Sequence, residues 1–477
     1  MRSWTGRKRG LARKVAKAGA TALLFAAVPA LAQQAAPRDP AEPPQAKPQP
    51  RMLPRPLGAI SRQSIDEKSM RTLIHNLVSC GTRLTLSSWT DPKRGIGCGR
   101  DFVVARLNEI AKESGGKLQI VVDKFESKSE RTGPNPVHLE NVYAILPGAD
   151  PKLAKTVFIV VGDVDSRPSN VMDPEADAPG ADDDGSGTAV SVECARLLSR
   201  PEANGHGKFG SLRATLLFGV LSGEEQGLLG AYRLLDWTKE QGYAVGAMLD
   251  NDIVGADPAP GGPHRVRVFS GNGEIEDADS PARELARAIE EIDGRNAIRM
   301  IFRQDRYGRG GDHFPFYKAG LPGVRFTEPL EDYNHQHQTP RTENGVEYGD
   351  FEKYLNYTFM GNVARDNAEV LRQLAMAPAP PTNARLKGAV TPDAKVSWQA
   401  EDDAERAGFE VLWRETTDPR WRVYEFVTEP GEAVLKGVST DNHFFAVRSV
   451  AKNGARSLAV PTEMERRPPP GPTPTKQ

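Results

Sequence analysis

Residues 156–187 read TVFIVVGDVDSRPSNVMDPEADAPGADDDGSG, and this stretch decides the fold. The apolar run over 157–161 has the length and composition of a buried strand, and it ends in the carboxylates Asp163 and Asp165. A segment with prolines then leads to a second acidic cluster at 182–184, which Gly-Ser-Gly closes. Open α/β sheets bind ligands beyond the carboxyl ends of their strands, and clustered carboxylates raise one another's pKa unless a cation compensates them. The stretch therefore predicts either a solvated acidic turn or a cation site.

The chain has 477 residues, which is enough for two or three domains. Its composition, with 38% hydrophobic and 26% charged residues, is that of a globular protein. The formal net charge of −1 gives no basis for binding nucleic acid or an anionic membrane surface.

The first 32 residues have the three parts of a secretory signal peptide. A basic segment ends at Lys17, an apolar segment covers 18–28, and Ala30-Leu31-Ala32 matches an A-x-A cleavage site. The apolar segment is shorter than the roughly 20 residues that span a membrane. We therefore expect cleavage before Gln33, no transmembrane segment in the mature chain, and export to the periplasm or the extracellular space.

The three cysteines gain meaning from this expected export, because exported chains can form disulfides. Cys80 and Cys98 lie in one small region and predict a disulfide, with two free thiols as the alternative. Cys194 lies in a helical apolar pattern, which predicts a buried thiol.

Periodicity and composition divide the mature chain into a large and a small domain. Strand-like runs alternate with helical ones over most of its length, which predicts an α/β fold with a central sheet covered on both faces. After a proline-containing linker the period changes to two, which predicts a small all-β sandwich. The expected parts are a signal peptide (1–32), a proline-rich linker (33–57), a catalytic domain (58–375), a linker (376–383), a β domain (384–466) and a disordered tail (467–477).

Local patterns predict the positions of individual elements. The capping box Ser64-x-x-Glu67 predicts the start of the first helix. Further helices are expected at 100–114, 281–293 and 351–375, and strands at 118–125, 141–148, 156–162, 214–221, 245–253 and 266–270.

Acidic and histidine residues fall at the ends of the predicted strands or in the loops after them. Taken singly, each has an ordinary structural interpretation as a turn residue or as a partner of a helix dipole. Taken together, they are the ligand inventory of a divalent metal site. A pair of adjacent glutamates suits such a site, because neighbouring side chains in extended structure point opposite ways, so one can bind metal while the other accepts a proton from water. The residues are Asp163, Asp165, Asp183, Glu224, Glu225, Asp252, His335 and His337.

The motifs in chain order are similar to those of a known family. GDVDS, GADDDGSG, SGEEQGLLG, LDNDIVG and GGDHFPF, with GTR near the first helix and a late histidine, resemble the co-catalytic dizinc aminopeptidases of metallopeptidase family 28, in clan MH. The resemblance covers residues 64–373, and its specificity lies in the set of motifs. It implies a three-layer α/β/α sandwich with a mixed central sheet, of the zinc-exopeptidase type, and two divalent metal ions.

The resemblance implies a metal-binding role for each matching residue. Asp183 matches the ligand that bridges both metals, Glu225 a ligand of one metal, and Asp252 a ligand of the other. His337 matches the late histidine ligand, with His335 as the alternative.

The resemblance also assigns residues that do not bind metal. Glu224 matches the general base. Asp165 matches an aspartate that orients the residue two positions before it. Asp312 and His313 match a pair that supports the site.

Two positions depart from the family pattern. Asp163 stands where the family has a histidine ligand, and Gln336 stands where a tyrosine often stabilises the tetrahedral oxyanion. Four carboxylates and one neutral imidazole give the set of Asp163, Asp183, Glu225, Asp252 and His337 a charge of −4, which cancels two divalent ions. We therefore expect weaker Lewis acids than in the family. Zinc is the first expectation, and Mn²⁺ or mixed occupancy is the alternative, because one metal would have only oxygen ligands.

The C-terminal strands resemble a fibronectin type III domain in VSW, GFEVLWR and FFAVRSVAKNGARS. We interpret this domain as a spacer or as a module that docks to protein or to the cell envelope. An edge extension of the catalytic core is the alternative.

These observations predict an exported metal-dependent exopeptidase that acts on peptides or small aminoacyl compounds. An aminopeptidase is preferred to a carboxypeptidase on family frequency alone. A catalytically weak or silent peptide-binding homologue is the main alternative, motivated by Asp163 and Gln336. A related hydrolase or cyclase acting on N-terminal residues is a third reading.

Overall fold

The computed structural model describes residues 57–200, 212–258, 262–271, 279–301, 310–388 and 390–465. The predicted signal peptide, nearly all of the first proline-rich linker and the C-terminal tail lie outside the described residues. In the described part of the chain, no helix is long and apolar enough to cross a membrane.

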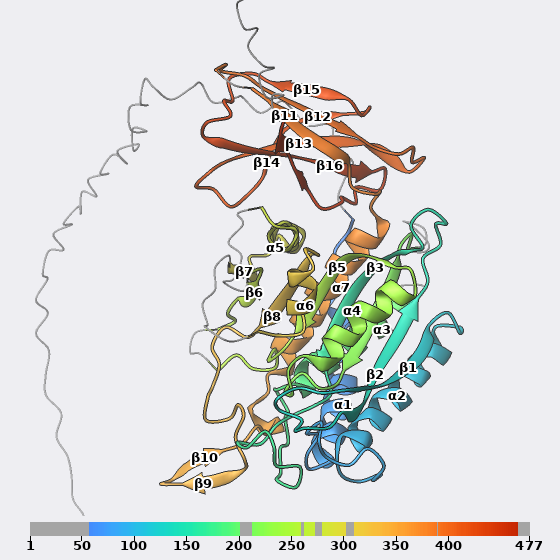
Figure 1. Ribbon diagram of the computed structural model, residues 1–477, viewed down its shortest axis with the longest axis vertical. Helices are drawn as coiled ribbons and strands as arrows, with labels where there is room; N and C mark the ends of the chain where they lie inside the picture. Colours follow the sequence, from blue (N-terminus) through green and yellow to red (C-terminus); the bar gives the residue numbers. More distant parts are fainter. Residues whose placement is uncertain are drawn as a thin grey trace, which may run out of the picture. The chain divides into compact units, whose positions relative to one another are not determined.

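An eight-stranded sheet forms the centre of the large domain, with the strand order β1-β2-β4-β3-β5-β8-β6-β7 (Figure 1). Its strands β4, β3, β5 and β8 are parallel neighbours, whereas β1, β2 and β6 run antiparallel to their neighbours β2, β4 and β8. The predicted α/β class with a mixed central sheet is confirmed. The bounds are β1 (Gln119–Ser127), β2 (Val137–Leu146), β3 (Thr156–Asp163), β4 (Thr215–Leu221), β5 (Ala244–Asn251), β6 (Val266–Phe269), β7 (Ile298–Ile301) and β8 (Gly323–Thr327).

Helices cover both faces of this sheet. Side chains of β3 alternate between the two faces: Phe158 and Val160 join the core that includes α1, α2, α3 and α7, while Ile159 and Val161 join the core that includes α4 and α6. Burial on both faces explains why β3 is a continuous apolar run. The helices are α1 (Glu67–Ser79), α2 (Ile96–Glu113), α3 (Gly185–Ser199), α4 (Leu229–Glu240), α5 (Pro281–Asp293), α6 (Phe314–Lys318) and α7 (Tyr357–Met376).

The start of α1 differs from the capping-box prediction. Asp66 is the N-cap residue, and its side chain accepts a hydrogen bond from the Ser69 backbone N–H at 2.9 Å. Ser64 instead ends a short 3₁₀ turn, and its carbonyl accepts a hydrogen bond from Arg196. An aspartate closer to the first turn therefore took the capping role, because its oxygen reaches an unpaired N–H of the helix.

Two further helices begin at other residues than predicted. The second helix starts at Ile96 rather than 100, because Gly95 turns the chain with φ of +99° and packs against Ser88, where a Cβ would meet the carbonyl oxygen at 2.4 Å. The last helix starts at Tyr357 rather than 351, because Asn356 caps it. The sequence reading also missed β7 and the hairpin of β9 (Arg341–Glu343) and β10 (Val346–Tyr348).

The predicted cysteine states are confirmed. Cys80 and Cys98 form a disulfide that joins the end of α1 to the start of α2. Cys194 on α3 is a buried free thiol.

The C-terminal β domain consists of two four-stranded sheets, ordered β15-β12-β11-β18 and β14-β13-β16-β17. Its core contains Trp398, Phe409, Trp413 and Phe445. The resemblance to a fibronectin type III domain stays a prediction. The strands are β11 (Thr382–Lys387), β12 (Ala394–Gln399), β13 (Arg406–Glu415), β14 (Arg422–Val427), β15 (Glu432–Leu435), β16 (His443–Ala451), β17 (Val460–Pro461) and β18 (Glu463–Met464).

Candidate metal centre

The predicted site residues lie at the carboxyl edge of the parallel strands. Asp163 is the last residue of β3, the Glu224-Glu225 pair lies in the turn between β4 and α4, and Asp252 follows β5. Since β4, β3 and β5 are parallel neighbours, their carboxyl ends and these side chains meet at one edge. His337 comes from the long loop after β8.

Three of the five predicted ligands gather around one point. Donor atoms of Asp183, Glu225 and His337 all lie within 4.8 Å of one another. The Nε2 atom of His337 is 2.8 Å from an Asp183 carboxylate oxygen and 3.1 Å from one of Glu225. One imidazole and two carboxylates are donor types that bind Zn²⁺, and three protein ligands leave the fourth position of a tetrahedral site open.

The electrostatics of this group favour a positive charge at its centre. Burial lowers the pKa of His337, but the carboxylates of Glu225 and Asp183 outweigh burial and raise the pKa to about 10. Either a proton on this imidazole or a bound metal ion can compensate the negative charge of the two carboxylates. The donor types and the charge therefore fit a divalent metal. Of the two histidines left open by the sequence, His337 belongs to the group, whereas the His335 ring stacks on Tyr354 with centroids 3.7 Å apart.

Asp183 is held by its backbone and by its two neighbours. Asp350 accepts hydrogen bonds from the backbone N–H groups of Asp182 and Asp183, at 2.9 and 2.8 Å. Asp184 caps α3 by accepting from the Gly187 N–H at 2.9 Å, and Asp182 accepts from the Gly255 N–H at 2.7 Å. The Asp183–Asp184 peptide bond is cis. The outer two carboxylates of the cluster therefore brace the loop.

A buried arginine ties the same loop to the end of β3. The Arg83 guanidinium donates hydrogen bonds to the carbonyls of Val164, Pro179 and Gly180, at 2.7, 2.6 and 2.7 Å. Burial lowers the pKa of Arg83, and nearby carboxylates, Asp350 first among them, oppose that shift. Arg83 thus holds both ends of the 164–180 segment that separates Asp163 from Asp183.

Asp165 makes contacts beyond the predicted one. That it orients Asp163 stays a prediction, and in the structure its carboxylate accepts hydrogen bonds from the backbone N–H groups of Gly223, Glu224 and Glu225, at 2.8, 3.3 and 3.1 Å. Burial and the Glu225 carboxylate raise the pKa of Asp165 to about 6 against these hydrogen bonds. The backbone turns sharply here, since Gly223 has a φ of +79°. Asp165 therefore positions the Glu224-Glu225 turn.

Glu224 faces the site as a half-buried carboxylate. Burial raises its pKa well above the usual range, and the carboxylates of Glu225, Asp252 and Asp312 add to the shift. A carboxylate with a raised pKa next to a metal-binding group can accept a proton from water, which is the role expected from the sequence.

Asp163 and Asp252 do not complete a second group of three donors. Among the described residues, the Asp183 group alone brings three such ligand atoms together. An oxygen of Asp252 lies 2.9 Å from a guanidinium nitrogen of Arg325, and both side chains are buried. Asp163 is buried among carboxylates, and its pKa is raised well above the usual range by burial and by Asp184 and Asp165. The five predicted ligands are therefore close in the fold but not assembled as one set.

The predicted supporting pair lies behind the site. The His313 ring contacts Asp250 at 3.0 Å, and its backbone N–H donates to the same carboxylate at 3.1 Å. Both carboxylate oxygens of Asp312 are buried and have no hydrogen-bond partner among the described residues. Burial and Asp250 raise the pKa of Asp312 well above the usual range.

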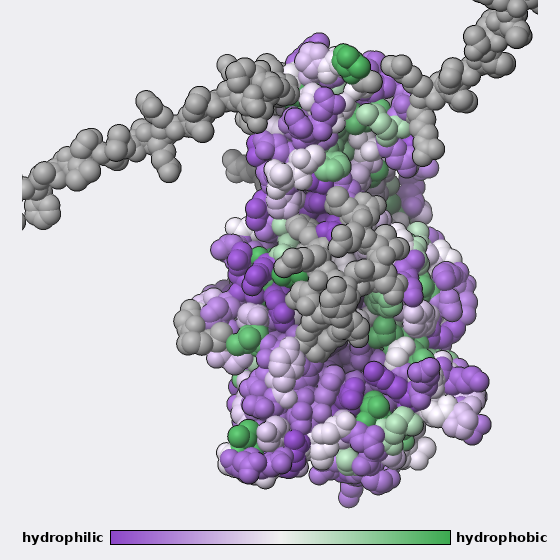
Figure 2. All heavy atoms as spheres, turned by 60° about the vertical axis from the view of Figure 1, so that its left-hand side comes forward, coloured by the Kyte–Doolittle hydropathy of each residue, from purple (hydrophilic) through white to green (hydrophobic). Residues whose placement is uncertain are grey.

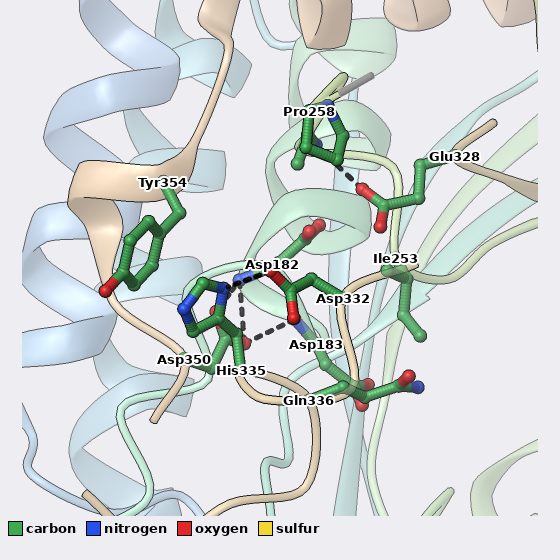
Figure 3. A pocket seen from close by; sticks show the side chains of 11 residues that line it. Asp182, Asp183, Ile253, Pro258, Glu328, Asp332, His335, Gln336, Asp350 and Tyr354 are labelled. Carbon is green, nitrogen blue, oxygen red and sulfur yellow. Dashed lines mark hydrogen bonds and ion pairs between the residues drawn. The ribbon is translucent and has the colours of Figure 1, made fainter. Parts of the chain in front are cut away.

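A pocket of about 130 Å³ opens beside Asp183. Figure 3 shows it between the loop of His335 and Gln336 and the start of α3, with Asp182, Asp350 and Glu328 in its wall. Burial and the neighbouring Asp182 raise the pKa of Glu328 to about 12.

Sequence reasoning missed several residues that shape the site. Arg83 lies in the GTR motif, but nothing local to Arg83 or to Arg325 reveals their buried partners. No sequence pattern around Asp350 or Glu328 indicates a role at the site, because both lie in loops.

Comparison with known proteins gives consistent matches. The model of the family described as "Peptidase family M28" matches residues 141–357. A protein of Leptosphaeria maculans named a probable zinc metalloprotease is 37% identical over 420 residues, covering 83% of this chain and 95% of that protein. A protein of the same description from Pyrenophora tritici-repentis is 38% identical over 435 residues, covering 85% and 95%. Among solved structures, the LapA aminopeptidase of Legionella pneumophila has 19% identity and a TM-score of 0.49, over 66% of this chain and 71% of that chain.

Proposed function

The chain belongs to peptidase family M28 and is a metallopeptidase, and on that premise we propose that it is an exported, zinc-dependent aminopeptidase. One observation carries the proposal: the donor atoms of Asp183, Glu225 and His337 lie within 4.8 Å of one another, and Glu224 is the adjacent residue of the same turn. The relatives named as zinc metalloproteases support zinc as the ion.

The residues of the site divide the work between binding and proton transfer. A zinc ion held by Asp183, Glu225 and His337 would supply a Lewis acid that polarises the substrate carbonyl and acidifies water. Glu224 accepts the proton of the attacking water and returns it to the amine that leaves. Asp165 keeps Glu224 and Glu225 in place through their backbone N–H groups. The five-ligand set predicted from the sequence would hold two ions, but this proposal needs only one.

The acidic character of the site supports the proposal that it binds the amino end of a peptide. Carboxylates outnumber cationic side chains around the donors, and the adjacent pocket is walled by Asp182, Asp350 and Glu328. The oxygens of these carboxyl groups can accept hydrogen bonds from a free ammonium group, which favours the amino end of a peptide. A carboxypeptidase would need a cation in that place.

Release of a chromophore from aminoacyl substrates tests this function. The purified chain, loaded with zinc, should cleave a panel of aminoacyl nitroanilides, and a chelator should abolish the release until zinc is restored. N-acetylated forms of the same substrates are the matched control and should stay intact, because they lack the ammonium group. Cleavage of acetylated substrates only, or of peptides from their carboxyl end, would contradict the aminopeptidase proposal.

The second candidate is a silent peptide-binding protein on the same fold. Asp163 and Gln336 stand where the resembling family has a metal ligand and an oxyanion donor. Peptide binding by calorimetry, together with no cleavage of any substrate by the zinc-loaded chain, would favour this candidate. A product with a lower mass by one ammonia or water would instead favour a cyclase.

We also propose that the chain is exported and that the C-terminal domain is a spacer or a docking module to protein or to the envelope. The A-x-A site at 30–32 supports cleavage before Gln33. Figure 2 shows one face that is mostly hydrophilic, with scattered hydrophobic side chains. The mass of the secreted chain checks export, and a chain that retains residues 1–32 would contradict it.

A further inference from the structure

Asp252, the predicted ligand of the second metal, is engaged by a buried arginine. An oxygen of the Asp252 carboxylate lies 2.9 Å from the Arg325 guanidinium, and each side chain is 7% exposed. The same guanidinium donates to the Gly310 carbonyl and lies 3.5 Å from the Asp252 carbonyl oxygen. The positive charge of Arg325 therefore lies close to the position that a metal bound to Asp252 would occupy.

The position of Arg325 is fixed by the sheet. Arg325 lies on β8, where it pairs with Asp250 of β5 on one side and with Phe269 of β6 on the other. This pairing fixes the backbone of Arg325 beside the site. The side chain is also surrounded by carboxylates, with Asp252, Asp250, Glu331 and Glu224 all raising its pKa. Arg325 is a permanent cation of this half of the site.

Asp163 does not supply the missing ligand. The backbone of this residue is fixed, because its N–H donates to Asp184 at 3.0 Å and its carbonyl accepts from the Thr188 hydroxyl at 2.6 Å. An aspartate side chain is shorter than the histidine side chain of the resembling family. Accordingly, the described residues form one group of three donor atoms, at Asp183, and none at Asp163 and Asp252.

From this arrangement we infer that the chain holds one metal ion and that the Arg325 guanidinium, paired with Asp252, supplies the positive charge at the position of the second. The inference rests on the proposed metallopeptidase function and narrows it to a mononuclear centre. A second divalent ion would meet like charge at Arg325 and would have to share Asp252 with it. The other reading of the contact makes Arg325 an outer partner that orients Asp252 toward a bound metal. That reading requires two ions per chain.

Metal stoichiometry of the wild-type chain decides between one ion and two. The full chain is saturated with ZnCl₂, freed of loose metal by gel filtration, and analysed by mass spectrometry of the metal together with protein concentration. A Co²⁺ titration followed by visible absorbance gives an independent count. We expect about one ion per chain in both measurements. Two ions would overturn the inference and leave the proposed function intact, whereas no bound ion would overturn both.

Matched variants test which carboxylates bind the ion. Asp163→Asn changes the charge at the same size, and its metal content should stay at about one ion per chain. Glu225→Gln is the matched change inside the donor group and should reduce the content to near zero. Loss of the ion in the Asp163→Asn variant would overturn the inference, because it would make Asp163 a ligand.

Variants of Arg325 test its part in the inference. Arg325→Met removes the charge and frees Asp252, so the folded variant should take up a second ion from MnCl₂, an ion that suits oxygen ligands. Arg325→Lys keeps the charge and should stay at one. A folded Arg325→Met chain that still binds one ion would overturn the role of Arg325. If that variant does not fold, a single ion in the wild type with no change in Asp163→Asn supports the inference.

Discussion

Two regions of the molecule are rich in buried carboxylates, and they use them in opposite ways. At the surface of α5, arginines of the C-terminal β domain pair with the carboxylates they face. Arg414 contacts Asp279 at 2.5 Å, and Arg448 contacts Glu291 at 2.6 Å and Glu410 at 2.5 Å. Such charge-assisted, partly bidentate pairs give the buried guanidinium groups of Arg414 and Arg448, which are 3% and 6% exposed, partners with specific geometry.

At the metal centre, carboxylates lie against other carboxylates. Burial raises the pKa of Asp163, Glu224 and Asp312, and in each case neighbouring carboxylates raise it further. The buried arginines there, Arg83 and Arg325, bind carbonyls and Asp252 rather than the donor group. The difference teaches that carboxylates paired with arginines join parts of the fold, whereas carboxylates gathered against one another favour a cation and proton transfer.

The largest effect is expected from Glu224, the proposed proton acceptor at the metal centre. Glu224→Gln keeps the size of the side chain but removes the proton acceptor, so kcat should fall roughly 10²- to 10⁴-fold. Metal content should not change, because Glu224 lies outside the donor group. The measurement is kcat on an aminoacyl chromophore together with metal analysis. Glu225→Gln is the control and should lose metal; the opposite pattern would mean that the two glutamates exchange roles.

The edge of the sheet at which the metal centre lies could be predicted from the sequence, because its signals are local. Asp163 and Asp252 follow apolar strand-like runs, and the parallel order of β3 and β5 brings such strand ends to one edge. The Glu pair and His337 were found through motifs in chain order. The central sheet was predictable for the same reason, since strands buried on both faces are continuous apolar runs.

The partners of the buried charges could not be predicted, because they lie far apart in the chain. Arg83 bonds carbonyls 81 to 97 residues away, and Asp350 binds the Asp182 backbone across 168 residues. The contact of Asp165 with the Glu224 turn spans 59 residues, so a rule based on its neighbour two positions earlier could not find this partner. Arg325 likewise meets Asp252 only because β8 pairs with β5.

Metal binding should stabilise the metal centre and leave the contacts between α5 and the C-terminal β domain unchanged. A ligand that binds only the folded chain, present at a thousandfold excess over its Kd, raises the free energy of unfolding by about 4 kcal/mol. We therefore expect a lower Tm in chelator and a rise with added zinc, measured by thermal unfolding. His337→Ala removes one donor and should abolish the zinc-dependent rise. The same rise in that variant would place the stabilising ion elsewhere.

Breaking an ion pair of the C-terminal domain should lower the free energy of unfolding without changing the metal centre. Arg448 is 6% exposed and faces Glu410, which is fully buried. Arg448→Met should lower the free energy of unfolding by about 3 kcal/mol, at the low end for breaking a buried pair, because Arg456 still contacts Glu410 at 3.1 Å. Urea unfolding measures the change, and metal content should stay the same.

An exposed pair of the same interface is the control for Arg448. Arg420 contacts Glu290 at 2.7 Å but is 63% exposed. Arg420→Ala should cost well under about 1 kcal/mol, because solvent screens the pair. Equal losses in the two variants would mean that burial does not set the strength of these contacts.

The last prediction concerns Glu284, a buried carboxylate of α5 whose raised pKa resembles those at the metal centre. Burial raises its pKa from 4.5 to about 7, although Arg287 and the Trp421 indole N–H oppose the shift. Because the folded pKa lies above the unfolded one, the folded chain binds the extra proton between these values, and stability falls as pH rises through about 7. Between pH 5 and pH 8 this loss amounts to roughly 2 to 3 kcal/mol. Glu284→Gln cannot lose a proton, so the difference in unfolding free energy between variant and wild type should shift by that amount in favour of the variant. Urea unfolding at both pH values measures it, and a difference that does not change with pH would show that Arg287 keeps Glu284 ionised, as complete pairing of the interface requires.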